Sequence, residues 1–404
     1  MHRSVICTFI GLAVFIAACR EDGAIQGPVA SAVSSGGGYE IIDLGTLDPA
    51  ATGLSSSIAR AINERGQVVG GSTTGIGDPR PQGAFHAFLW DNGVMTDLGT
   101  LGGRTSNALY INERGDVTGG SETATGEGHA FFWANGVLQD IGTLGGIGSG
   151  PTGLSAMGAV VGVSNTATGA LHAFLWQDGT LQDLGTLDGG TTSAAAAVNR
   201  SGTVVGESNT ASGESHAVVW QGGVARDLGT LGGTFSTATA ISDNGEVTGQ
   251  STDAAGQKHA FRWSGGVMQD LGGLPDYPVT VGVAISPSGQ VAGSGTTQSA
   301  FPVHGFVWVR GQMQDLGTLG GPSTFVRALN VQGQVVGTSL TCGSVSCSRA
   351  FVSADGVLRD LGALPGHQNS EAYAINSRGD VVGRSLLNIS SDARHAVLWR
   401  RVRP

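Results

Sequence analysis

The chain reads Ala240-Ile241-Ser242-Asp243-Asn244-Gly245-Glu246-Val247-Thr248-Gly249-Gln250-Ser251, and His259-Ala260-Phe261-Arg262-Trp263 follows after seven residues. The motif closes with Ser264-Gly265-Gly266-Val267-Met268-Gln269-Asp270-Leu271-Gly272. Its final Asp-Leu-Gly, or Asp-Ile-Gly, recurs at Asp43, Asp97, Asp140, Asp183, Asp227, Asp270, Asp315 and Asp360. The intervals are 54, 43, 43, 44, 43, 45 and 45 residues. A period near 44 residues indicates a repeat architecture.

Turn residues divide each unit into four expected strands. The first turn has Asn or Ser three residues before Gly, as in Ser242 and Gly245, and a second turn follows the Trp, as in Ser264-Gly265-Gly266. Asn-Gly, Asp-Gly and Gly-Gly supply the positive φ angles that tight hairpins require. Four antiparallel strands in about 44 residues are typical of one β-propeller blade.

The two ends of the chain indicate how the repeat closes. Tyr39–Gly45 matches the last strand of a unit without the three strands before it, whereas the final unit ends soon after Trp399 and lacks that strand. Pairing the two would remove the open sheet edges of a linear array. We therefore predict an all-β fold in which residues 39–404 form one β-propeller. Eight turns of the Gly66 type favour eight blades; seven blades or a β-solenoid are the alternatives.

Composition excludes several other classes of protein. The chain has 404 residues, of which 69 are Gly, but Gly does not recur at every third position as collagen requires. Apolar residues recur throughout, which argues against disorder. The formal net charge of −10 and the single lysine, Lys258, argue against a nucleic-acid partner.

The N-terminal residues predict a targeting signal for export. His2-Arg3-Ser4 precedes an apolar run from Val5 to Ala18, which is typical of a secretory signal. Ile16-Ala17-Ala18-Cys19 resembles the bacterial lipobox, whose Cys is lipidated before cleavage. This predicts a lipoprotein signal peptide over residues 1–18, a flexible tether over 19–38, and a lipid anchor at the outer membrane or cell surface. A plain signal peptide is the alternative.

Two aromatic residue types recur in register with the repeat. Seven copies of a residue, one in each of seven units, cannot all belong to a single active site. We therefore predict structural roles for both the recurrent histidines and the recurrent tryptophans. The histidine is expected to be a buried hydrogen-bonding group joined to the unit's Ser or Asp. The two sets are His86, His129, His172, His216, His259, His304 and His395, and Trp90, Trp133, Trp176, Trp220, Trp263, Trp308 and Trp399.

The recurring His-Ala-Phe, together with Asp-Leu-Gly-Thr-Leu-Gly-Gly as at Asp97 to Gly103, resembles the bacterial HAF family of probable extracellular repeat proteins. The resemblance extends from Tyr39 to Trp399. It departs in the seventh unit, where Arg349 and Ser353 occupy the His and Trp positions. The resemblance implies export and a repeat architecture, and it brings no catalytic residues.

Cys342 and Cys347 lie in that divergent unit. In an exported protein a local disulfide is favoured over a metal site, because no cluster of His and Cys adjoins the pair. Two independent free thiols are the alternative. The sequence contains no phosphate-binding loop and no Ca²⁺ loop, so we expect no cofactor and no metal.

Candidate binding residues lie where the repeat is broken. The links between second and third strands share one rim of a propeller with the links between units. That rim would carry Asp78, Arg80, Asp276, Tyr277 and His367. The alternative is that these loops differ between units only because their sequences are not under selection.

These features predict a monomeric, surface-tethered, non-enzymatic scaffold that binds an extracellular protein or glycan and contacts the membrane through its lipid alone. The alternative is an extracellular carbohydrate-active or hydrolytic enzyme that uses the channel and Asp78, Asp276 and His367. A purely structural envelope protein is a third reading.

Overall fold

The computed structural model describes residues 24–25, 33–35, 38–48, 55–75, 84–344, 347–354, 356–387 and 393–402. Every regular element within these ranges is a strand, and none of them is a helix. No helix that could cross a membrane is therefore present in the described part of the chain. The signal over residues 1–18, Cys19, Asp78 and Arg80 lie outside the described residues.

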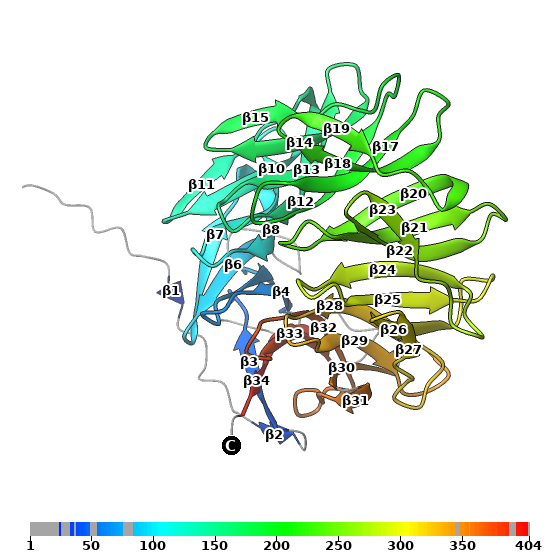
Figure 1. Cartoon of the computed structure of the whole chain (residues 1–404). Helices are drawn as coiled ribbons and strands as arrows, with labels where there is room; N and C mark the ends of the chain where they lie inside the picture. The colour runs from blue at the N-terminus through cyan, green and yellow to red at the C-terminus, as the bar shows by residue number, and fades with distance from the viewer. Residues whose placement is uncertain are drawn as a thin grey trace, which may run out of the picture.

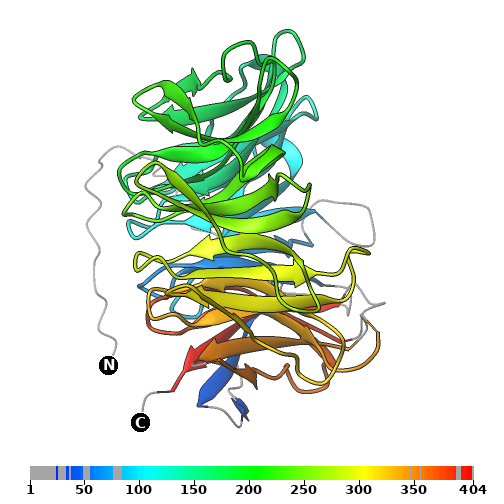
Figure 2. The ribbon, with the colours of Figure 1, turned by 45° about the vertical axis from the view of Figure 1, so that its right-hand side comes forward.

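The strands pair in groups of four, and we call each group a unit. Within a unit the first strand pairs with the second, the second with the third and the third with the fourth, always antiparallel. A single parallel bridge between Phe85 and Thr105 merges the first two units, so the eight groups form seven hydrogen-bonded sheets. Figures 1 and 2 show these sheets arranged around a ring.

The bounds of the strands follow the repeat. The first strands are β4 (Ser57–Ile62), β8 (Gly102–Ile111), β12 (Gly145–Leu154), β16 (Ser193–Val198), β20 (Gly232–Ile241), β24 (Val279–Ile285), β28 (Thr324–Leu329) and β32 (Asn369–Ile375). The second strands are β5 (Val68–Thr73), β9 (Val117–Thr123), β13 (Val160–Thr166), β17 (Val204–Asn209), β21 (Val247–Asp253), β25 (Val291–Thr296), β29 (Val335–Leu340) and β33 (Val381–Leu386).

The third strands are β6 (Phe85–Asp91), β10 (Gly128–Ala134), β14 (Leu171–Gln177), β18 (Ser215–Gln221), β22 (Lys258–Ser264), β26 (Val303–Val309), β30 (Ser348–Ala354) and β34 (Arg394–Arg401). The fourth strands are β7 (Val94–Gly99), β11 (Val137–Asp140), β15 (Thr180–Asp183), β19 (Val224–Asp227), β23 (Val267–Asp270), β27 (Gln312–Asp315), β31 (Val357–Asp360) and β3 (Tyr39–Gly45).

The first strands form the inner ring. Each contacts the first strands of the two neighbouring units, and β32 contacts β4 in the same way. Asparagine amides in the first turns reinforce this ring: Nδ2 of Asn112 donates to the carbonyl of Ser155, and Nδ2 of Asn376 donates to the carbonyl of Asn63, 313 residues away in sequence. The described strands therefore form a closed β-propeller, as predicted, and the solenoid alternative is wrong.

The closing strand is β3, at the opposite end of the sequence from its partner. It pairs antiparallel with β34, and the register places Ile41 opposite Trp399. Figure 1 shows the two strands side by side, β3 in blue and β34 in red. Ile41 and Trp399 are 2% and 0% exposed, because the two strands bury their apolar residues against the neighbouring unit. The surplus strand at the start of the chain thus supplies the strand that the last unit lacks.

The hydrophobic core lies between consecutive units. One cluster joins Val69 and Leu98 of the first unit to Ala108, Val117 and Phe131 of the second. Clusters of the same kind join the other neighbours around the ring, including the last unit to the first. The tryptophans belong to these clusters or pack at their edges, so their recurrence reflects packing of the units.

The segment expected to be a flexible tether contains two short strands. β1 (Ala24–Ile25) pairs with β7, and β2 (Val33–Ser35) pairs with β3. Backbone hydrogen bonds to an outer strand can hold such a segment even though its sequence has no hydrophobic period.

Candidate functional site

The recurrent histidines share one geometry. In each case Nδ1 of the ring contacts an oxygen of the Asp in the unit's Asp-Leu-Gly, at 2.7–2.9 Å. The pairs are His86–Asp97, His129–Asp140, His172–Asp183, His216–Asp227, His259–Asp270, His304–Asp315 and His395–Asp43. In the last pair the two residues come from opposite ends of the chain.

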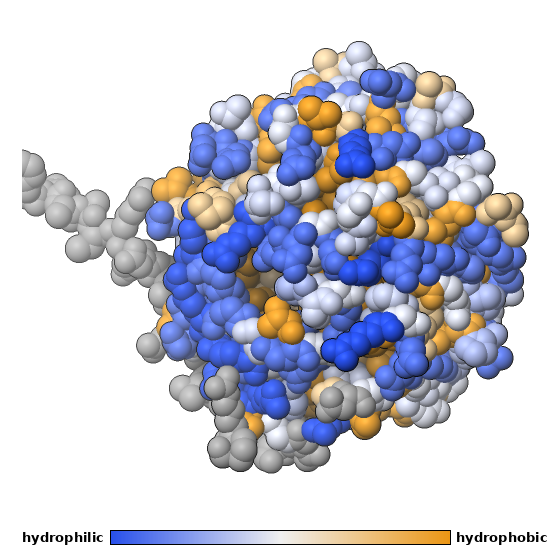
Figure 3. All heavy atoms as spheres, viewed as in Figure 1, coloured by the Kyte–Doolittle hydropathy of each residue, from blue (hydrophilic) through white to orange (hydrophobic). Residues whose placement is uncertain are grey.

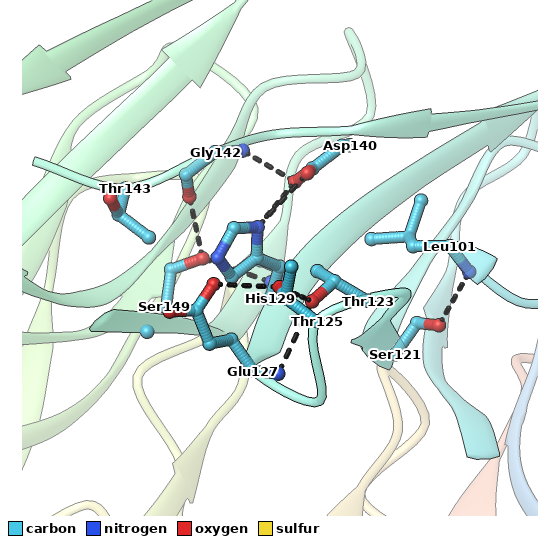
Figure 4. A network of polar contacts seen from close by, with 12 residues as sticks. Leu101, Ser121, Thr123, Thr125, Glu127, His129, Asp140, Gly142, Thr143 and Ser149 are labelled. Atoms are coloured by element: carbon cyan, nitrogen blue, oxygen red, sulfur yellow. Dashed lines mark hydrogen bonds and ion pairs between the residues drawn. The ribbon is translucent and has the colours of Figure 1, made fainter. Parts of the chain in front are cut away.

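The backbone places this aspartate. Its other interaction is with the glycine two residues later: the amide of Gly142 donates to Oδ1 of Asp140 at 2.7 Å, and Gly142 has φ of +80°. A residue with a Cβ would be strained at that angle, which explains why glycine ends every Asp-Leu-Gly. Figure 4 shows Asp140 between Gly142 and the ring of His129.

The histidines are half-buried rather than buried, with side-chain exposures from 15% for His129 to 32% for His395. They pair with Asp, whereas the unit's Ser bonds to backbone: Oγ of Ser149 donates to the carbonyl of Gly142 and accepts from the amide of Ala130. The ring lies at the rim, near the start of the third strand, so water reaches one of its edges. The histidine's other nitrogen, Nε2, makes no hydrogen bond within the described residues of the second unit.

The divergent seventh unit keeps the propeller topology. Its strands β28–β31 pair like the others, and Nε of Arg349 lies 4.0 Å from Oδ2 of Asp360 in place of the His–Asp pair. Ser353 fills the Trp position and is 3% exposed. Cys342 and Cys347 form a disulfide with a Cα–Cα distance of 5.6 Å.

Two of the rim candidates cover a recurrent histidine. The ring of Tyr277 stacks on His304 with centroids 4.1 Å apart, and desolvation together with Asp315 and Asp276 raises the pKa of the Tyr277 hydroxyl. The ring of His367 lies edge-on to His395, with centroids 5.9 Å apart. Burial, followed by the charge of His395, lowers the pKa of His367. Its Nδ1 lies 3.1 Å from Oγ of Ser385.

The structure does not bring these rim candidates together. Asp276 and Tyr277 lie in the link before β24, and His367 lies in the link before β32, with the units β24–β27 and β28–β31 between the two links. Among the described residues, no hydrogen bond or ion pair joins Asp276 to His367. Asp276 and His367 are the two predicted catalytic residues that the structure describes, and they do not form the expected catalytic group.

A cavity of about 700 Å³ opens beside one of the His–Asp pairs. His129 lines it together with Phe85, Arg104, Glu122 and Ser149. It lies on the rim formed by the links between second and third strands. Three other cavities lie on the opposite rim, near Gln290, Asn135 and Asn244, and no histidine lines them. His129 is thus a recurrent histidine that faces a space large enough for a small ligand.

No group of three or more His, Cys, Asp or Glu side chains within the described ranges could hold a metal ion. The chemistry available at the cavity is that of a base paired with a carboxylate. Asp140 can hold the proton of His129 on Nδ1, which leaves Nε2 free to accept another.

Comparison with known proteins supports the fold. No family model and no curated protein matches the chain. A structure from a study of two prolyl endopeptidases is similar with a TM-score of 0.55 and 10% identity, over 82% of this chain and 54% of that chain. This chain thus spans about half of that protein's length. The β-propeller domain of the Trilobed protease from Pyrococcus furiosus aligns over 86% of this chain and 98% of that domain, with a TM-score of 0.45 and 8% identity.

These findings correct one prediction. The prediction of a non-enzymatic scaffold is contradicted, because a similar structure with a TM-score of 0.55 comes from a study of two prolyl endopeptidases. A puromycin-hydrolysing peptidase of Mycobacterium tuberculosis also aligns, over 89% of this chain and 60% of that one, with a TM-score of 0.45 and 14% identity. The alternative, a hydrolytic enzyme, fits them better. At such low identity the likeness establishes the propeller fold and carries no residue roles.

Proposed function

We propose that the chain is a hydrolase that cleaves a peptide bond at the cavity beside His129. The observation that carries the proposal is the His129–Asp140 pair, joined at 2.9 Å, on the wall of a 700 Å³ cavity. The similar structure with a TM-score of 0.55 comes from a study of prolyl endopeptidases, and this supports a peptide as the substrate class.

The proposed reaction uses water as the nucleophile. Nε2 of His129 accepts a proton as water adds to the carbonyl carbon, and the same nitrogen returns that proton to the leaving amine when the C–N bond breaks. Asp140 orients the ring and stabilises its charged form. Ser149 is not assigned as a nucleophile, because its hydroxyl proton is already donated to the carbonyl of Gly142.

The repeat supplies a matched control for the test. His259 occupies the same position in another unit, pairs with Asp270 at 2.9 Å and is 18% exposed, against 15% for His129. Hydrolysis of a panel of short peptides should fall at least about 100-fold in kcat/KM for His129→Gln. His259→Gln should retain the activity of the native chain.

Two outcomes would contradict the proposal. The first is a native chain that releases no amine from any peptide in the panel. The second is an equal loss for His129→Gln and His259→Gln, which would mean that every His–Asp pair has only a structural role. Denaturation curves for both variants establish that each is folded under the assay conditions.

A further inference from the structure

One sector of the inner ring differs in charge from the rest. Every first strand has a register shift against its second strand, and one residue lies at the shift. In five consecutive units this residue is uncharged: Leu109, Thr152, Ala196, Thr239 and Val283. In the remaining three consecutive units it is Arg327, Tyr373 and Arg60. Two arginines therefore flank one tyrosine on the inner ring.

Tyr373 is the centre of this sector. Cζ of Arg60 lies 5.0 Å from the centroid of the Tyr373 ring, and Cζ of Arg384 lies 6.0 Å from it. Burial, together with the charge of Glu371, raises the pKa of Tyr373 to about 12. The hydroxyl therefore stays protonated at neutral pH and donates to Oε2 of Glu371.

The one carboxylate of the sector is already paired. Glu371 accepts from Nε of Arg384 at 3.0 Å and from Nη2 at 2.9 Å. Burial alone would raise the pKa of Glu371, but hydrogen bonds from Arg384 and Tyr373 outweigh it, so the pKa is lowered. The charge of Glu371 is thus balanced mainly by Arg384, with which it shares two hydrogen bonds, and the charge of Arg327 acts on it more weakly.

Three arginines around this pair keep an uncompensated charge. Arg60, Arg327 and Arg394 have no carboxylate within salt-bridge distance among the described residues. Nε of Arg60 is buried and has no hydrogen-bond partner, whereas Nε of Arg394 donates to Oγ of Ser56 at 2.9 Å. Burial, with the charges of Arg384, Arg394 and Arg327, lowers the pKa of Arg60. A guanidinium nevertheless remains charged in a protein.

We infer that this sector binds an anionic group, a carboxylate or a phosphate, between Arg60, Arg327 and Arg394. A guanidinium presents several donors in a geometry that matches carboxylate and phosphate oxygens. The chain has a net charge of −10, so the local excess of arginine does not follow from its overall composition. The site is separate from the cavity at His129, and the inference does not depend on the proposed hydrolysis.

The test is a calorimetric titration of the full chain with three probes: inorganic phosphate, N-acetyl-dialanine and its C-terminal amide. We expect phosphate or the free acid to bind and the amide not to bind. Binding of phosphate alone would identify a phosphate site, and binding of the free acid alone a carboxylate site. The inference is overturned if neither phosphate nor N-acetyl-dialanine binds, or if the free acid and the amide bind equally.

Matched variants locate the site. Arg60→Gln and Arg327→Gln should each weaken binding at least about tenfold. Arg200→Gln, which removes the same charge from an exposed turn elsewhere, should leave binding unchanged. Because Arg327 is exposed, its variant remains informative if Arg60→Gln does not fold. Native affinity in Arg327→Gln, or an equal loss in Arg200→Gln, overturns the assignment.

Discussion

A glycine in the second strand of every unit lies against the backbone of the first strand. In β9 this is Gly119, opposite Ala108, where a Cβ would lie 2.0 Å from the carbonyl oxygen of Asn107. In all eight units, a Cβ added to this glycine would lie 1.9–2.2 Å from a carbonyl oxygen of the first strand, beside that strand's register shift. The glycine of the Val-Val-Gly motif is therefore required by close packing of two backbones and not by a positive φ.

Neighbouring glycines allow this requirement to be tested. A Cβ on Gly120, the next residue of β9, would have no atom within 4 Å. Gly119→Ala should destabilise the fold by about 3 kcal/mol, because the backbone of β8 must move away. Gly120→Ala should change the free energy of unfolding by less than about 1 kcal/mol. Urea denaturation of the two variants checks this, and similar midpoints would show that the strands can relax around the methyl group.

At the scale of elements, the pair His395–Asp43 joins β34 to β3. Oδ2 of Asp43 lies 2.7 Å from Nδ1 of His395, and His367 is the other titratable ring that contacts His395. The hydrogen bond to Asp43 outweighs burial and raises the pKa of His395 above its ordinary value of 6.5. The protonated ring is therefore bound more tightly in the folded chain than in the unfolded one.

The sign of the pH effect follows from this shift. A raised folded-state pKa gives a stabilisation that is complete below pH 6.5 and is lost as the pH rises through the folded-state value. The difference in unfolding free energy between the native chain and His395→Gln should be larger at about pH 5.5 than at about pH 8.5. The pH-dependent part of this free-energy difference should stay below about 1 kcal/mol, because the side chains of His395 and Asp43 are both partly exposed. Chemical denaturation at both pH values measures it, and a pH-independent difference would refute the role of Asp43.

At the scale of the whole molecule, one sheet determines whether the ring is closed. Its strands β2 and β3 come from the start of the chain, and its strands β32–β34 come from the end. Ile41→Ala should destabilise the protein by about 3 kcal/mol, because Ile41 is 2% exposed and packs in the core of this sheet. Glu40→Ala, on the opposite face of β3, should cost less than about 1 kcal/mol. Equal denaturation midpoints for the two variants would mean that β3 contributes little to closure.

Much of this architecture could be predicted, because the repeat is local in sequence. The turn at Asn63–Gly66 and the strand Tyr39–Gly45 each have a pattern that can be read without knowledge of the fold. The extension of β8 back to Gly102 could not, because Gly102-Gly103 has the composition of a turn while its backbone pairs with Thr123.

The candidate sites were harder to predict for a geometric reason. A His–Asp pair recurs in seven of the eight units, so the sequence reveals all seven pairs and does not show that the pair at His129 faces a cavity. Arg60 lies more than 300 residues before Tyr373 in sequence, and only the closed ring makes them neighbours. An alignment of the eight units would have placed Arg60, Arg327 and Tyr373 at one position and so given a signal for the charged sector.

The pairing of β3 with β34 means that the ring of strands can close only late in the synthesis of the chain. Asp43 and His395 are 352 positions apart, so a chain made from its N-terminus carries β3 without its partner while nearly all the rest is synthesised. At about 5–20 residues per second, that wait lasts on the order of half a minute. Throughout that time, the nascent chain has one open edge on β3 at its beginning and one open sheet edge at its growing end. Nascent copies on one messenger could therefore exchange β3 with each other before either had produced its own β34.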